Sequence, residues 1–81
     1  MESTEDKVRR LLAGQFGIEP ARITNDADLV NDLGLDSLDT VEVAMMLEEE
    51  FGIAIPDEKM EKAKTFGNLI TIINEASHAE A

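Results

Sequence analysis

Apolar residues in this chain recur at the three- and four-residue spacing of an α-helix, which constrains its fold more than any other feature. The clearest stripe lies near the N-terminus and consists of Val8, Leu11, Leu12 and Phe16. These side chains would share one side of a helix and pack it against a core. No stretch alternates apolar and polar residues convincingly, as a half-buried strand does. The sequence therefore predicts an all-α fold.

Capping residues, glycines and prolines mark the limits of four predicted helices. The first begins near Ser3 or Thr4 and ends at Gly17. Gly52 ends the second helix, and Pro56 suits the first turn of the third. The second, third and fourth helices are expected over about Ser37 to Phe51, Asp57 to Lys62 and Phe66 to Glu75.

A long connection, residues 17–36, joins the first two helices. It contains turn residues such as Pro20 and Gly34, but apolar residues such as Leu29 are interspersed among them. We therefore expect it to pack over the core, with a short helical turn near residues 28–33. Loops of this length in small domains are often functional.

These elements predict a small four-helix bundle of three main helices and a short third helix, with a long loop between the first and second helices. Residues 1–81 form a single domain in this interpretation, near the lower size limit for folding on one core. Residues 77–81 are expected to form a frayed tail.

Composition narrows the class of protein. The chain has no cysteine, which excludes disulfides and metal–thiolate sites. No apolar run approaches the roughly 18 residues of a transmembrane helix. The first six residues are acidic and polar, unlike a signal peptide. We therefore expect a soluble, cytoplasmic protein.

The charge balance is strongly acidic. Eighteen acidic residues against seven basic ones give a formal net charge of -11. Such a surface repels nucleic acid phosphates and anionic lipid headgroups, so we expect no nucleic acid partner and no stable membrane insertion. It favours encounters with basic patches on other proteins. The alternative is that the acidity serves only solubility.

The second predicted helix has two apolar sides. At about 100° per residue, one side gathers Val43, Ala44, Leu47 and Phe51, and the other gathers Leu38, Val41 and Met45. Acidic residues border the second side, namely Asp39, Glu42, Glu48 and Glu49. Apolar residues rimmed by like charges indicate a docking surface, and like charges around the one exposed apolar side also favour a monomer. The alternative is a broad core face beside an ordinary solvated acidic face.

Ser37 lies where this helix begins. The structural interpretation is that Asp36 or Ser37 is the N-cap, with Asp39 near the third helical position. The functional interpretation is compatible with it, because a hydroxyl at a helix start is exposed and the helix N-terminus favours a phosphate. The physics permits a phosphodiester on Ser37 without requiring one.

Neither a catalytic site nor a metal site is expected. The sole histidine, His78, falls in the predicted tail, so a Ser-His-Asp arrangement has no positioned base. An EF-hand fitted to Asp26 and Asp28 places Val30 at the third ligand position and Asn31 at the glycine position, so the match fails. Loose surface binding of divalent cations is left open.

Several segments together resemble bacterial-type acyl carrier proteins. The first is Asp32-Leu33-Gly34-Leu35-Asp36-Ser37-Leu38-Asp39-Thr40-Val41-Glu42. Two more are Leu47-Glu48-Glu49-Glu50-Phe51-Gly52-Ile53 and Ile55-Pro56-Asp57-Glu58. The similarity extends in register from about Val8 to Asn74. An Asp-Ser-Leu tripeptide alone is weak evidence, but in this acidic context the resemblance is strong.

The resemblance implies a carrier that is not an enzyme. Ser37 would bear 4′-phosphopantetheine, added from coenzyme A by a carrier-protein synthase (a phosphopantetheinyl transferase). The arm's thiol would hold acyl groups as thioesters, and Asp36 and Leu38 would serve recognition. Synthase, ketosynthase, reductase, dehydratase and acyltransferase enzymes with basic patches are the implied partners. The implied docking residues are Leu38, Asp39, Val41, Glu42, Met45, Glu48 and Glu49.

The resemblance also implies that acyl chains fold back between the helices. A space of this kind requires a core that opens easily, and flexible methionines suit it. Plain core filling is the alternative for these methionines. The residues expected to line the pocket are Leu29, Val30, Leu47, Ile55, Met60, Ala63 and Ile70.

Some residues depart from the family's usual pattern. Residues 58–64 are more basic, Met60 and Ala63 exchange a larger and a smaller residue, and Phe66 replaces a β-branched residue. The leading hypothesis is a carrier for fatty acid biosynthesis. Alternatives are a specialised carrier for lipid A, polyketide or another secondary lipid, an acidic helical interaction module that is never modified, and a metal-binding regulator.

Overall fold

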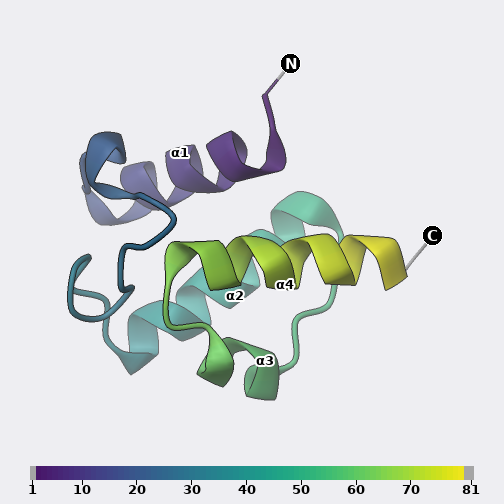
Figure 1. The fold of residues 1–81 in the computed structure, drawn as a ribbon. Helices are drawn as coiled ribbons and strands as arrows, with labels where there is room; N and C mark the ends of the chain where they lie inside the picture. Colours follow the sequence, from purple (N-terminus) through teal and green to yellow (C-terminus); the bar gives the residue numbers. More distant parts are fainter. Residues whose placement is uncertain (1, 80–81) are drawn as a thin grey trace.

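The computed structural model describes residues 2–79, with side chains as far as residue 77. It is the predicted small all-α bundle (Figure 1). A short 3₁₀ helix that the sequence analysis did not predict, η1, follows the first α-helix. The elements are α1 (Thr4–Phe16), η1 (Pro20–Arg22), α2 (Ser37–Phe51), α3 (Asp57–Lys62) and α4 (Phe66–Ala79).

Local signals set most helix ends where the sequence predicted them. The Ser3 hydroxyl accepts a hydrogen bond from the Asp6 N–H at 3.1 Å and caps α1. Gly17 and Gly52 end α1 and α2 in left-handed conformations, with φ of 65° and 64°. Glycine is favoured there because it has no Cβ to clash in that region.

The end of α4 corrects one expectation. We expected the helix to end near Glu75 and residues 77–81 to form a frayed tail, but α4 continues to Ala79. No glycine or proline follows Glu75 to stop it, and alanine favours the helix. Ala76 also packs against the core, which supports the extra turn. Residues 80 and 81 lie outside the described part.

The long connection between α1 and α2 is anchored as predicted. Ile23, Leu29, Leu33 and Leu35 are all buried. The Asp28 carbonyl accepts from the Asp32 and Leu33 N–H groups at 2.9 and 3.0 Å, closing the expected turn at residues 28–33. The loop therefore forms part of the core wall.

This turn is joined to the α3–α4 connection by backbone hydrogen bonds. The Leu29 N–H donates to the Lys64 carbonyl at 2.8 Å, and the Phe66 N–H donates to the Ala27 carbonyl at 3.0 Å. Asp28 and Thr65 form an isolated antiparallel bridge between them. Two segments far apart in sequence are thus held side by side next to the start of α2.

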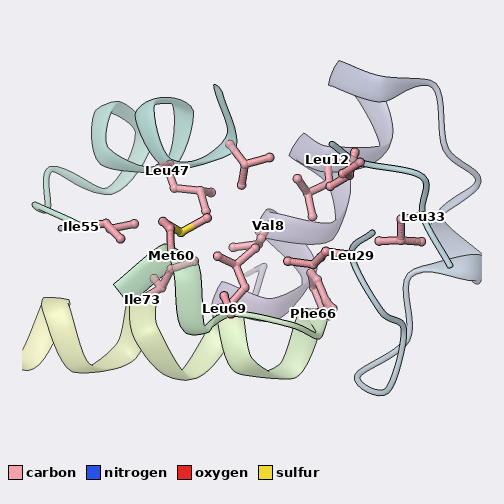
Figure 2. Close-up of a cluster of buried hydrophobic side chains, with 14 of the residues drawn as sticks. Val8, Leu12, Leu29, Leu33, Leu47, Ile55, Met60, Phe66, Leu69 and Ile73 are labelled. Carbon is pink, nitrogen blue, oxygen red and sulfur yellow. The ribbon is translucent and has the colours of Figure 1, made fainter. Parts of the chain in front are cut away.

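The core lies where the four helices and the long loop meet (Figure 2). Phe66, Leu69 and Ile73 of α4 are fully buried, as are Val8 and Leu12 of α1. The buried residues of the described part are all apolar, with no polar or charged side chain among them. No α-helix in this part is long and apolar enough to cross a membrane.

Candidate functional site

Ser37 is the first residue of α2, and its side chain is exposed. Asp36, not Ser37, caps the helix: its Oδ1 accepts from the Asp39 N–H at 2.9 Å, and Asp39 Oδ2 accepts from the Asp36 N–H at 3.1 Å. Because this reciprocal pair satisfies the helix start, the Ser37 hydroxyl is not needed there. It forms no hydrogen bond within the described part of the chain. A rigid first turn therefore presents an uncommitted hydroxyl to solvent.

Two cavities lie beside Ser37. The larger, about 500 Å³, opens toward the 28–31 turn and the α3–α4 connection. The smaller, about 240 Å³, lies between α2 and α3 and reaches Val41 and Asp57. Ser37, Thr40, Met60 and Glu61 line both cavities.

Sequence reasoning did not identify three of the residues around Ser37. Thr40 lies three positions after Ser37 on the same side of α2, and that spacing was the available signal. Glu61 and Lys64 carried no signal, because only the folded chain brings α3 and its following loop beside Ser37.

The predicted acyl-pocket residues fall into three groups. Leu29, Leu47 and Ile55 are buried in the core, and Leu47 and Ile55 lie close to Met60 (Figure 2). Met60 and Ala63 are also buried, and both line the larger cavity at Ser37. These two residues therefore connect the cavity with the core.

Val30 and Ile70 are less buried than the other residues that were predicted to line the pocket. Val30 is 56% exposed, because its place in the 28–33 turn leaves it outside the core, although it lines the mouth of the larger cavity. Ile70 is half-buried and lines a separate depression with Asn25 and Thr65.

The apolar side of α2 that was predicted to dock partners is exposed. Leu38, Val41 and Met45 are 73%, 52% and 60% exposed. Val43, Ala44 and Leu47, on the other apolar side, are buried. The helix thus has one core side and one open side, while the docking role stays a prediction.

The acidic residues around that open side are not equivalent. Glu42 and Glu49 are exposed and form no hydrogen bond or ion pair among the described side chains. Asp39 closes the capping box of α2. Glu48 is half-buried, and its Oε2 accepts from the Ile55 N–H at 2.8 Å. The capping role of Asp39 confirms the sequence prediction, whereas the bond from the Ile55 N–H to Glu48 was not predicted, because it requires the folded loop.

In the acidic loop before α2, a carboxylate accepts hydrogen bonds from the loop's own backbone N–H groups. Asp28 Oδ1 accepts from the Asn31 and Val30 N–H groups at 2.8 and 2.9 Å. These bonds, that of Asn31 first, hold the pKa of Asp28 below its ordinary value. The described residues contain no cluster of three or more metal-ligating side chains. The side chain of His78 lies outside them.

Comparison with protein families agrees with this geometry. A family model described as the phosphopantetheine attachment site matches residues 6–73, which is most of the chain. Members of this family carry covalently attached 4′-phosphopantetheine, act as carriers rather than catalysts, and interact with phosphopantetheinyl transferases and partner enzymes. The chain therefore belongs to the phosphopantetheine attachment-site family of carrier proteins.

Proposed function

We propose that Ser37 is the attachment residue and that this chain is an acyl carrier protein of the bacterial type, serving fatty acid biosynthesis. The observation that carries the proposal is the exposed, uncommitted hydroxyl of Ser37 at the start of α2. Ser37 is also the only serine within the matched residues 6–73. Ser3, by contrast, uses its hydroxyl to cap α1.

The surroundings of Ser37 fit a phosphodiester-linked arm. The two cavities provide space on either side of the hydroxyl. The N-terminus of α2 favours an anion nearby, and Lys64 lines the larger cavity. The arm supplies a thiol for thioester chemistry, which a chain without cysteine cannot supply itself.

The chain's own part in loading is to present a nucleophile. The Ser37 oxygen attacks the β-phosphorus of coenzyme A, a new O–P bond forms, and adenosine 3′,5′-bisphosphate leaves. No side chain of the described part accepts a hydrogen bond from the Ser37 hydroxyl. We propose that a base of the transferase takes its proton, in keeping with the carrier role of the family, whose members are not catalysts.

The open side of α2 supports the proposal of a basic docking partner. Leu38, Val41 and Met45 offer apolar contact next to Ser37. Glu42 and Glu49 offer charges not used within the described part, so they are the acids best placed to meet a partner's basic patch. Like charges around this surface oppose self-association, which supports a monomer.

We place the acyl chain between the larger cavity and the core. Met60 lines the cavity and lies near Leu47 and Ile55 in the core (Figure 2), so a change of its flexible side chain would open a path inward. Each methylene buried along that path would contribute about 0.8 kcal/mol. This supports a pocket built on Met60, Ala63, Leu29, Leu47 and Ile55.

The proposal also chooses between fatty acid biosynthesis and a specialised pathway. The acidic α2 supports the general role in fatty acid biosynthesis. The exposed Lys59 and Lys62 of α3 are the feature that favours a specialised pathway instead. We give priority to the general role because the open side of α2 lies next to Ser37.

The test is reconstituted chain elongation. Protein loaded by a broad-specificity phosphopantetheinyl transferase is mixed with the malonyl transferase, ketosynthase and reductase of fatty acid synthesis, and the thioesters are followed by mass. We expect elongation on the wild type and none on Ser37→Ala, whose helical circular dichroism should be unchanged. A loaded wild type that these enzymes do not elongate would contradict the general role and support the specialised one.

A further inference from the structure

The larger cavity beside Ser37 is lined by carboxylates and by one cation. Asp28, Asp36 and Glu61 line it together with Lys64, which is the only basic residue among the described residues that line either cavity. A phosphodiester on Ser37 would add another negative charge among these carboxylates. Because like charges repel at short range, a nearby cation would offset part of this added charge, beside the favourable N-terminus of α2.

The backbone of Lys64 is fixed from both sides. Its N–H donates to Asn68 Oδ1 at 3.1 Å, and its carbonyl accepts from the Leu29 N–H at 2.8 Å. The next residue, Thr65, forms the bridge to Asp28. The backbone of Lys64 is therefore already ordered at the cavity wall. Less conformational entropy is then lost when its side chain binds a ligand.

The ammonium group of Lys64 is available for a ligand. Lys7 pairs with Glu50 at 3.8 Å, and Lys59 pairs with Glu75 at 3.9 Å. Lys64 forms no ion pair and no side-chain hydrogen bond within the part of the chain described here. Its charge nevertheless acts locally, because it helps to lower the pKa of Asp28 after the backbone bonds from Asn31 and Val30.

We infer that Lys64 binds the phosphodiester of the arm on Ser37 and directs the arm into the larger cavity. This inference rests on the proposed function, since it needs the arm to be on Ser37. An ammonium–phosphate contact is charge-assisted and is stronger than a neutral hydrogen bond. Lys64 is thus a positioning residue for the arm, while the smaller cavity toward Val41 stays open.

Lys62 provides a matched control. It is the last residue of α3, two positions before Lys64, and it is exposed. It lines neither cavity at Ser37. Lys62→Gln and Lys64→Gln therefore remove the same charge from the same region, but only the second removes it from the cavity.

The experiment is NMR on the loaded protein, after intact mass has established one arm per chain. In ¹⁵N,¹³C-labelled wild type with an unlabelled arm, we expect filtered NOEs between the Hε protons of Lys64 and the dimethyl group beside the phosphate. The ³¹P resonance should move in Lys64→Gln by more than its line width and stay in place in Lys62→Gln. Amide spectra of the unloaded variants establish that both keep the fold.

The possible outcomes separate two claims: that the arm is attached to Ser37, and that Lys64 binds its phosphodiester. NOEs from the arm to Val41 and Asp57 but not to Lys64 would place the arm in the smaller cavity and overturn the inference. An unchanged ³¹P resonance in Lys64→Gln would overturn it too, while leaving the carrier function intact. Absence of any mass gain on the wild type would overturn the attachment to Ser37 and this inference together.

Discussion

Glu48 and Glu49 are adjacent in α2 and identical in charge, yet they differ in their contacts. Glu48 is half-buried and accepts a hydrogen bond from the Ile55 N–H, whereas Glu49 is exposed. Glu48→Ala leaves that N–H without its partner, which should lower the free energy of unfolding by about 1–2 kcal/mol. Glu49→Ala should change it by less than about 0.5 kcal/mol. Urea unfolding of both variants measures the difference, and equal effects would contradict the structural role of Glu48.

The contribution of Asp28 to the free energy of unfolding should depend on pH. Its pKa is held below the ordinary value of 3.8, mainly by the Asn31 N–H. A carboxylate with a lowered native pKa stabilises the fold fully above the ordinary value, and this stabilisation is lost as the pH falls through the lowered native pKa. Wild type should therefore be more stable than Asp28→Ala at neutral pH, and the gap should narrow below pH 3.8.

Urea unfolding across pH measures that gap. Asp26→Ala is the control, because Asp26 is exposed in the same loop and forms no hydrogen bond within the described residues. A gap between wild type and Asp28→Ala that is constant with pH, or that widens in acid, would contradict the account.

Two glycines within helices, Gly14 and Gly67, should respond in opposite ways to replacement by alanine. A Cβ at Gly14 of α1 would meet no atom within 4 Å, whereas a Cβ at Gly67 of α4 would lie 3.0 Å from the Asn25 carbonyl oxygen. That oxygen also accepts from the Gly67 N–H, so it is not free to move away. Gly14→Ala should raise the free energy of unfolding by up to about 1 kcal/mol through helix propensity.

Gly67→Ala should instead lower the free energy of unfolding by on the order of 1 kcal/mol, because the close contact outweighs the propensity gain. Thermal unfolding of the two variants beside wild type gives the comparison. Stabilisation of both variants by similar amounts would show that the loop at Asn25 yields easily, contrary to the structure.

The sequence predicted those elements whose limits are set by local chemistry. The glycines after α1 and α2 and the hydroxyl before α1 act on their own helix, so their effect is visible without the fold. The end of α4 was missed because no stop signal follows Glu75. The site was predicted less completely, since the pairing of Leu29 with Lys64 joins segments with no shared periodicity.

The same limit explains which features of the site the sequence did not predict. The exposure of Val30 and the partial burial of Glu48 depend on how the loops fold back, which spacing along one helix does not encode. The two sides of α2 were predictable because they follow from helical geometry alone. The structure confirms that the side predicted to be exposed, that of Leu38, Val41 and Met45, is the open one.

Net charge acts at the scale of the whole molecule. The protein measures 33 × 31 × 20 Å along its principal axes and carries a net charge of -11. At about 0.01 M salt the Debye length is about 30 Å, so charges across the whole molecule repel one another. At about 1 M salt it is about 3 Å, and this repulsion is removed.

We therefore expect Tm to rise by several degrees between these two NaCl concentrations, as measured by circular dichroism. Glu42→Gln with Glu49→Gln should show a smaller rise, because these exposed carboxylates contribute repulsion without any internal bond. A Tm that is independent of salt, or that falls, would show that self-repulsion does not limit this fold.

The central claim is that Ser37 alone carries the arm, and intact mass tests it most directly. Wild type, Ser37→Ala and Ser77→Ala are incubated with coenzyme A and a broad-specificity phosphopantetheinyl transferase. Ser77 is the control because it is an exposed serine outside the matched residues. We predict a gain of one phosphopantetheine on wild type and Ser77→Ala and none on Ser37→Ala. A gain on Ser37→Ala, or none on folded wild type with an active transferase, would contradict the account.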